Sequence, residues 1–111
     1  MKKIILSLMI LSISAFSNAK SQTYTILNGG GVDDLGLILK DSKNKEVHAY
    51  CDQKCGDWFD PDEESGGEHI KKKIIGKKVQ AEIKVENNRD RIVGPGANER
   101  LSFIKNIKLI K

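Results

Sequence analysis

Cys51 and Cys55 are the only cysteines of the 111-residue chain, and with His48 and His69 they are the residues best suited to redox or metal chemistry. In an oxidising compartment two cysteines usually form one disulfide, so we expect a Cys51–Cys55 bond. The alternative of a redox centre is less favoured, because the spacing is Cys-x-x-x-Cys and not the Cys-x-x-Cys of thioredoxin-like proteins. Two histidines and two cysteines could also hold a tetrahedral zinc ion. The spacing matches no usual zinc ligand set, however, and a disulfide would use both sulfurs, so no metal and no cofactor is expected.

Three arginines, Arg89, Arg91 and Arg100, flank the sequence Gly94-Pro95-Gly96. The planar guanidinium group binds carboxylates and phosphates through two parallel hydrogen bonds. We therefore predict that this segment is the preferred contact surface of the protein. The alternative is an exposed polar loop without a partner.

Charge is distributed unevenly along the chain. Residues 52–68 carry seven acidic side chains and one lysine, whereas residues 69–111 carry twelve basic and four acidic side chains. The acidic side chains could gather Ca²⁺, but their spacing does not follow the EF-hand pattern, so a solvated, mobile loop over residues 57–67 is expected. The opposed charges indicate either an acidic loop beside a basic sheet or patches that meet a partner.

Signatures of catalysis are absent from the sequence. Ser65 lies outside a Gly-x-Ser-x-Gly elbow. The run Gly29-Gly30-Gly31 lacks the Lys-Ser/Thr of a phosphate-binding loop and precedes two aspartates, so it is interpreted as a flexible turn. Carboxylates in a mobile loop cannot be assumed to keep the fixed separation that glycoside hydrolysis requires. We expect a protein that is not an enzyme.

Five segments are expected to form the strands that position these residues. The clearest is residues 79–86, in which every odd position is apolar and every even position polar. The others are residues 23–27, ended by the Asn-Gly-Gly-Gly run; the segment around Leu35, Leu37 and Leu39; the segment of Val47 and Ala49; and residues 101–110, with Phe103, Ile107 and Leu109 on one side.

One segment indicates a helix. Ile70, Ile74 and Ile75 fall on one face at helical spacing, and Gly76 follows at the position where helices commonly end. A short helix is therefore expected between the third and fourth strands.

This order of elements, together with the passage Ile74-Ile75-Gly76-Lys77-Lys78-Val79-Gln80-Ala81, resembles an OB-fold, a five-stranded barrel with a helix between strands three and four. The fold class expected is thus mainly β, and the alternatives are an open β-sandwich or a sheet with one helix packed across it. The resemblance implies binding on the faces of strands two and three, where His48 and Tyr50 lie, and on the loops over residues 28–34 and 87–100.

Residues 1–19 have the composition of a secretory signal peptide. Lys2 and Lys3 precede an apolar run that is too short to span a bilayer, and Ser17-Asn18-Ala19 offers small residues for cleavage. Residues 20–111 would then form a single domain with no membrane span, in the periplasm or outside the cell.

Two functions are consistent with these features, because fold alone does not assign one. The first is a small, exported, non-catalytic module that contacts another envelope or secreted protein in an inhibitor, immunity or accessory role. Trp58 and Phe59 are suited to anchoring such an interface, or else to plugging the open end of the barrel. The alternative is a binder of a small ligand or cell-envelope glycan on the barrel face. Nucleic acid is an unlikely partner, since aromatic stacking platforms are few and these two aromatics lie in the acidic segment.

Overall fold

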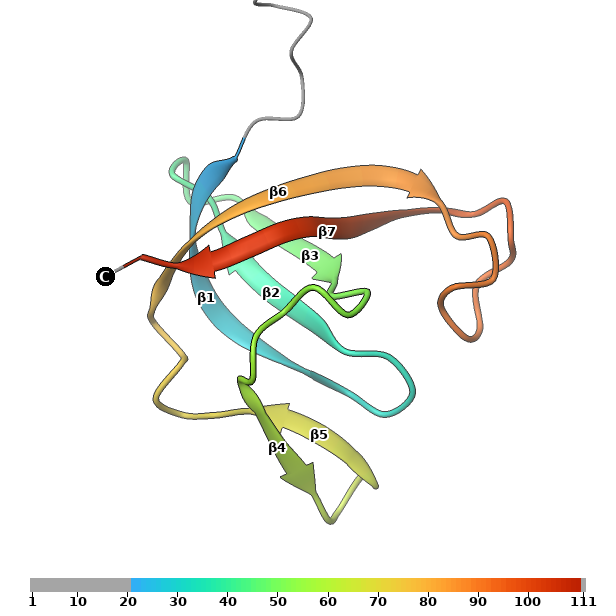
Figure 1. Cartoon of the computed structure of the whole chain (residues 1–111), viewed down its shortest axis with the longest axis horizontal. Coiled ribbons are helices and arrows are strands. Elements are labelled where there is room, and N and C mark those ends of the chain that lie inside the picture. The colour runs from blue at the N-terminus through green and yellow to red at the C-terminus, as the bar shows by residue number, and fades with distance from the viewer. Residues whose placement is uncertain (1–20, 111) are drawn as a thin grey trace, which may run out of the picture.

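The computed structural model describes residues 21–110, which form seven strands and no helix. The strands are β1 (Gln22–Gly31), β2 (Gly36–Lys40), β3 (Glu46–Tyr50), β4 (Phe59–Asp62), β5 (Gly67–Ile70), β6 (Lys78–Asn87) and β7 (Arg100–Leu109). Five of them close a barrel in the order β1-β2-β3-β7-β6 and back to β1, with β3 and β7 parallel and the other neighbours antiparallel (Figure 1). The expected five-stranded OB-like barrel is confirmed, and closure excludes the open sandwich.

The short helix expected before the fourth barrel strand is absent from this region, and the prediction was wrong. Ile70 ends β5, and the residues that follow form turns whose backbone groups bond to neighbouring segments. Gly76 donates to the carbonyl of Ile26 at 2.8 Å, and Ile26 donates to the carbonyl of Lys77 at 2.9 Å. Ile70 and Ile74 are buried, whereas Ile75 is 45% exposed. The isoleucines at helical spacing therefore belong to a strand end, which buries Ile70, and to a turn, which buries Ile74.

A second correction concerns residues 57–67, which were expected to form a mobile loop. They contain most of the β4–β5 hairpin, which extends from one end of the barrel where the helix was expected (Figure 1). The hairpin is attached to the barrel through pairing of β5 with the end of β1, with Gly30 opposite His69 and Gly31 opposite Glu68. Its strands are short, and its edge strand β4 carries Pro61, as edge strands commonly do.

The glycine run at residues 29–31 is part of β1 and not the flexible turn that was predicted. Gly30 has a φ of 146°, and a Cβ atom at this position would lie 2.6 Å from the carbonyl oxygen of Glu68. Only glycine allows both this conformation and the close approach of β5. The glycine run is therefore the part of β1 against which the backbone of β5 packs closely.

The barrel core is apolar and continuous. It consists of Tyr24, Ile26, Leu37, Leu39, Ala49, Cys51, Trp58, Phe59, Ile70, Ile74, Val79, Ala81 and Ile104. Ile104, and not Phe103, shares the inner side of β7 with Ile107, because a bulge opposite Glu82 and Ile83 shifts the alternation. Phe103 is fully buried on the outer side of the strand, against Tyr50 and Arg91.

Candidate binding site

A basic depression lies where β6 and β7 approach the loop that joins them. Its volume is about 380 Å³, and Val85, Glu86, Asn87, Arg89, Arg91, Arg100 and Lys105 line it. The structure therefore brings together the three arginines that the sequence predicted as a contact surface. It adds Lys105, which sequence reasoning missed. The only signal for Lys105 is a polar position in an apolar strand, and the bulge that determines its side of the strand cannot be identified from the pattern.

Asn88 fixes the loop that shapes one wall of the basic depression. Its side chain is fully buried, and its amide nitrogen donates to the carbonyls of Ile92 and Pro95, each at 3.0 Å. Its amide oxygen accepts from the backbone N–H of Ile92 at 2.7 Å. The backbone N–H of Val93 also donates to Asp34, 3.0 Å away in the β1–β2 loop. A polar side chain that is buried and fully bonded in this way holds its loop in one conformation.

Two tight turns without glycine meet at this end of the barrel. Arg89 and Asp90 have φ values of 52° and 62°, and the N–H of Arg91 donates to the carbonyl of Asn88. Asp52 and Gln53 have φ values of 47° and 66° within the second turn, whose Lys54 N–H donates to the carbonyl of Cys51. Positive φ at both central residues is typical of type I′ turns, which strongly prefer Asn and Gly. Arginine at such a position is unusual and costs conformational energy.

Arg91 connects the two turns and is largely committed to contacts within the chain. Its guanidinium group donates to Asp52 at 3.3 Å, to Glu86 at 3.2 Å and to the carbonyl of Asn87 at 2.7 Å. The same group lies over the Phe103 ring, 3.8 Å from its centroid. Through these contacts Arg91 is a positioning residue, which holds the loop after β6 against β7 and so shapes the basic depression.

Of the other three cations, Arg89 and Arg100 are exposed and Lys105 is half-buried. Arg100 donates to Asn87 and to the carbonyl of Val85, which orient its guanidinium at the rim of the depression. Lys105 donates to Glu86 at 3.1 Å. Arg89 is exposed, and within residues 21–110 its side chain makes no hydrogen bond. Hydrogen bonding from Lys105, assisted by Arg91, lowers the pKa of Glu86, so this single carboxylate stays ionised among four cations.

An acidic depression of about 340 Å³ adjoins the basic one, and Arg91 lines both. Its carboxylates are those of Asp33, Asp34, Asp52 and Glu68, and the disulfide forms part of its wall. Across residues 21–110, no group of three or more His, Cys, Asp or Glu side chains is arranged to hold a metal ion. Two depressions of opposite charge therefore adjoin each other, and of the acidic segment 52–68 only Asp52 and Glu68 contribute carboxylates to the acidic one.

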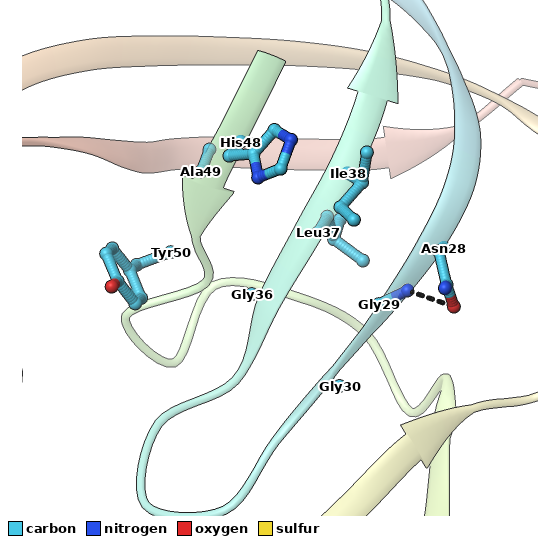
Figure 2. Close-up of a pocket in the computed structure, with 9 residues that line it drawn as sticks. All are labelled: Asn28, Gly29, Gly30, Gly36, Leu37, Ile38, His48, Ala49 and Tyr50. Atoms are coloured by element: carbon cyan, nitrogen blue, oxygen red, sulfur yellow. Dashed lines mark hydrogen bonds between the residues drawn. The ribbon is translucent and has the colours of Figure 1, made fainter. Parts of the chain in front are cut away.

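His48 and Tyr50, the other predicted binding residues, line a separate trough of about 360 Å³ on the outer face of β1, β2 and β3. Figure 2 shows them on β3, with Asn28 across the sheet on β1. Trp58 and Phe59 are each only 8% exposed and belong to the barrel core. Phe59 also lines the acidic depression, whereas Trp58 lines neither depression nor the trough.

The Cys51–Cys55 disulfide expected from the sequence is present. It closes the turn that places Asp52 beside Arg91. A disulfide is consistent with an oxidising location. No helix within residues 21–110 is long and apolar enough to cross a membrane. The predicted signal peptide lies outside the described residues.

Comparison of the chain with models of protein families, with curated proteins and with solved structures finds no match. The site must therefore be interpreted from its own chemistry.

Proposed function

We propose that this protein is an exported, non-catalytic binding module that contacts another envelope or secreted protein through the basic depression. One observation carries the proposal: Arg89, Arg100 and Lys105 line one depression that holds a single carboxylate, and Asn88 and Arg91 hold in place the loop that forms its wall. A preformed cationic surface binds without first having to be ordered, which lowers the cost of association.

The partner surface that fits this depression is acidic. Arg89 and Arg100 can each bind a carboxylate bidentately, and Lys105 adds a point charge between the strands. Such groups increase the rate of encounter with an oppositely charged protein and select against basic ones. An inhibitor, an immunity protein or an accessory subunit would use the surface in this way.

The proposed location is the periplasm or the exterior. Support comes from the leader-like composition of residues 1–19 and from the disulfide, since disulfides persist in oxidising compartments.

Affinity capture tests the proposal. The oxidised protein with a C-terminal tag is incubated with envelope extract, and bound proteins are identified by mass spectrometry. A variant with Arg89→Gln, Arg100→Gln and Lys105→Gln is compared with a control that loses three other cations, Lys43→Gln, Lys45→Gln and Lys108→Gln. We expect one stoichiometric partner that the control retains and the first variant loses. Equal retention by both variants, or recovery of no protein at low salt, would overturn the proposal.

A further inference from the structure

Part of the floor of the trough on the outer face of β1, β2 and β3 is bare backbone, and Leu37, Ile38 and Ala49 also line it. The register of the three strands aligns Gly30 with Gly36 and Gly36 with Tyr50. These three residues form a row across the sheet. The first two carry no side chain, and the third carries an aromatic ring. The distance from Gly30 to Tyr50 along the row is two strand spacings, about 10 Å.

The adjoining row supplies polar groups at both ends. Asn28 is aligned with Ile38, and Ile38 with His48. The Asn28 side-chain oxygen accepts from the N–H of Gly29 at 2.8 Å, as Figure 2 shows, and within residues 21–110 its NH₂ group donates no hydrogen bond. His48 contacts Glu46 through Nε2 at 2.9 Å, so its Nδ1 remains available.

The backbone conformation at position 36 does not require glycine, and the missing side chain leaves the trough open. Its φ lies outside the positive range, unlike that of Gly30, and a Cβ atom there would lie 3.2 Å from the carbonyl oxygen of Ala49, which would have to move by a few tenths of an ångström. Glycine within a strand weakens the strand and often marks a place where a ligand approaches the backbone closely.

The lining excludes several ligand classes. It contains no Lys, Arg, Asp or Glu, although charged residues make up 31% of the chain, so it offers an ionic ligand no permanently charged side chain. Gly36 is already paired on both sides, so an extended peptide cannot add as a strand here. A flat, neutral group with an apolar face and hydroxyls at its edge fits the combination of an aromatic ring, a partly bare floor and two hydrogen-bonding side chains.

We propose that this trough binds a pyranose ring of a neutral glycan. One face of the sugar lies on the backbone of Gly30 and Gly36 beside the Tyr50 ring, and its hydroxyl groups bond to Asn28 and His48. The site is separate from the basic depression and does not rest on the function proposed above.

Heteronuclear NMR of the ¹⁵N-labelled, oxidised protein tests this site with three neutral probes: maltotriose, cellotriose and tri-N-acetylglucosamine, each at roughly 10 mM, enough to detect a millimolar Kd. We expect at least one probe to shift the amide signals of Gly30, Gly36 and Tyr50. Gly36→Ala, which places a methyl group on the floor, should abolish the shifts. The matched control Gly96→Ala adds a methyl group where no atom lies within 4 Å and should retain them.

The spectra of both variants also report whether the barrel is intact. A second variant, Tyr50→Ala, provides an independent loss of binding if Gly36→Ala disturbs the sheet. The proposal is overturned if none of the three probes shifts these signals, or if the shifts persist in both Gly36→Ala and Tyr50→Ala. Shifts produced by an aromatic-rich peptide but not by the sugars would likewise overturn it.

Discussion

The guanidinium carbon of Arg91 lies 3.8 Å from the centroid of the Phe103 ring, and this contact joins the loop after β6 to the outer side of β7. Phe103 is fully buried although it faces away from the barrel core. The arginine therefore covers an aromatic ring that would otherwise be open to water, while it also neutralises Asp52 and Glu86. The stability of the barrel and the shape of the basic depression depend on the same side chain.

Replacing Arg91 by lysine should destabilise the protein by about 1–3 kcal/mol, because the planar stacking and the multiple hydrogen bonds are lost while the charge is kept. Urea denaturation measures the free energy of unfolding. Arg100→Lys, at an exposed position, serves as the control and should change it by less than about 0.5 kcal/mol. Equal effects of the two substitutions would contradict the role given to Arg91.

Asn88→Ala should lower the free energy of unfolding by about 1–3 kcal/mol, since it leaves two carbonyls and the N–H of Ile92 without their buried partner. Hydrogen exchange should show loss of protection at the Ile92 amide. The exposed residue Asn98 offers the control Asn98→Ala, which should change neither quantity. Unaltered protection at Ile92 in Asn88→Ala would show that the loop is held by other contacts.

Acidification should test the ion pairs of Glu86. Its pKa in the folded protein is lowered from the ordinary value of 4.5, chiefly by the hydrogen bond from Lys105. The stabilisation is therefore present above about pH 4.5 and is lost as the pH falls through the lower, folded pKa. Between about pH 6 and pH 3 the wild type should lose more stability than Glu86→Gln. Parallel stability curves for the two proteins would contradict this.

Removal of the disulfide by Cys51→Ser and Cys55→Ser should lower the free energy of unfolding by about 2 kcal/mol, the value expected from chain entropy for so short a loop. The turn that places Asp52 should also loosen, so the contact between Arg91 and Asp52 should weaken. Denaturation in urea, with and without reductant, measures the first effect. The wild type should respond to the reductant and the double variant should not.

Arg89→Gly should raise the free energy of unfolding by about 1 kcal/mol, because glycine adopts a φ of 52° without steric cost. Arg100→Gly, in β7, should lower it, since glycine weakens strands. Thermal unfolding followed by circular dichroism compares the two. A destabilised Arg89→Gly variant would indicate that Arg89 contributes to the fold itself.

The five barrel strands were predictable as elements because half-buried strands alternate apolar and polar residues, as residues 79–86 do. The β4–β5 hairpin was not, since it is rich in acidic residues, has no clear alternation and pairs with the barrel through a glycine in the distant strand β1. Local spacing made Ile70 and Ile74 look helical, whereas their burial is determined by contacts with the barrel.

The part of the candidate site that comes from one continuous segment of the chain was predictable. The three arginines share one segment, and the structure gathers them around one depression. Lys105 joins them only because a bulge and the β6–β7 register place it beside Glu86. Arg91 is held by contacts with Asp52 and Phe103, which are distant in sequence, whereas the Arg89 side chain makes no hydrogen bond to residues 21–110. No local pattern contains that information.

The most direct test of the central claim is quantitative capture by wild type and Arg89→Gly, side by side, from the same envelope extract. Arg89 is exposed and occupies a backbone position that favours glycine, so its replacement should not harm the fold. We predict that the variant is at least as stable as the wild type and binds the captured protein about tenfold more weakly, as expected for an arginine that anchors an interface. Undiminished capture by a stable Arg89→Gly variant would contradict the account.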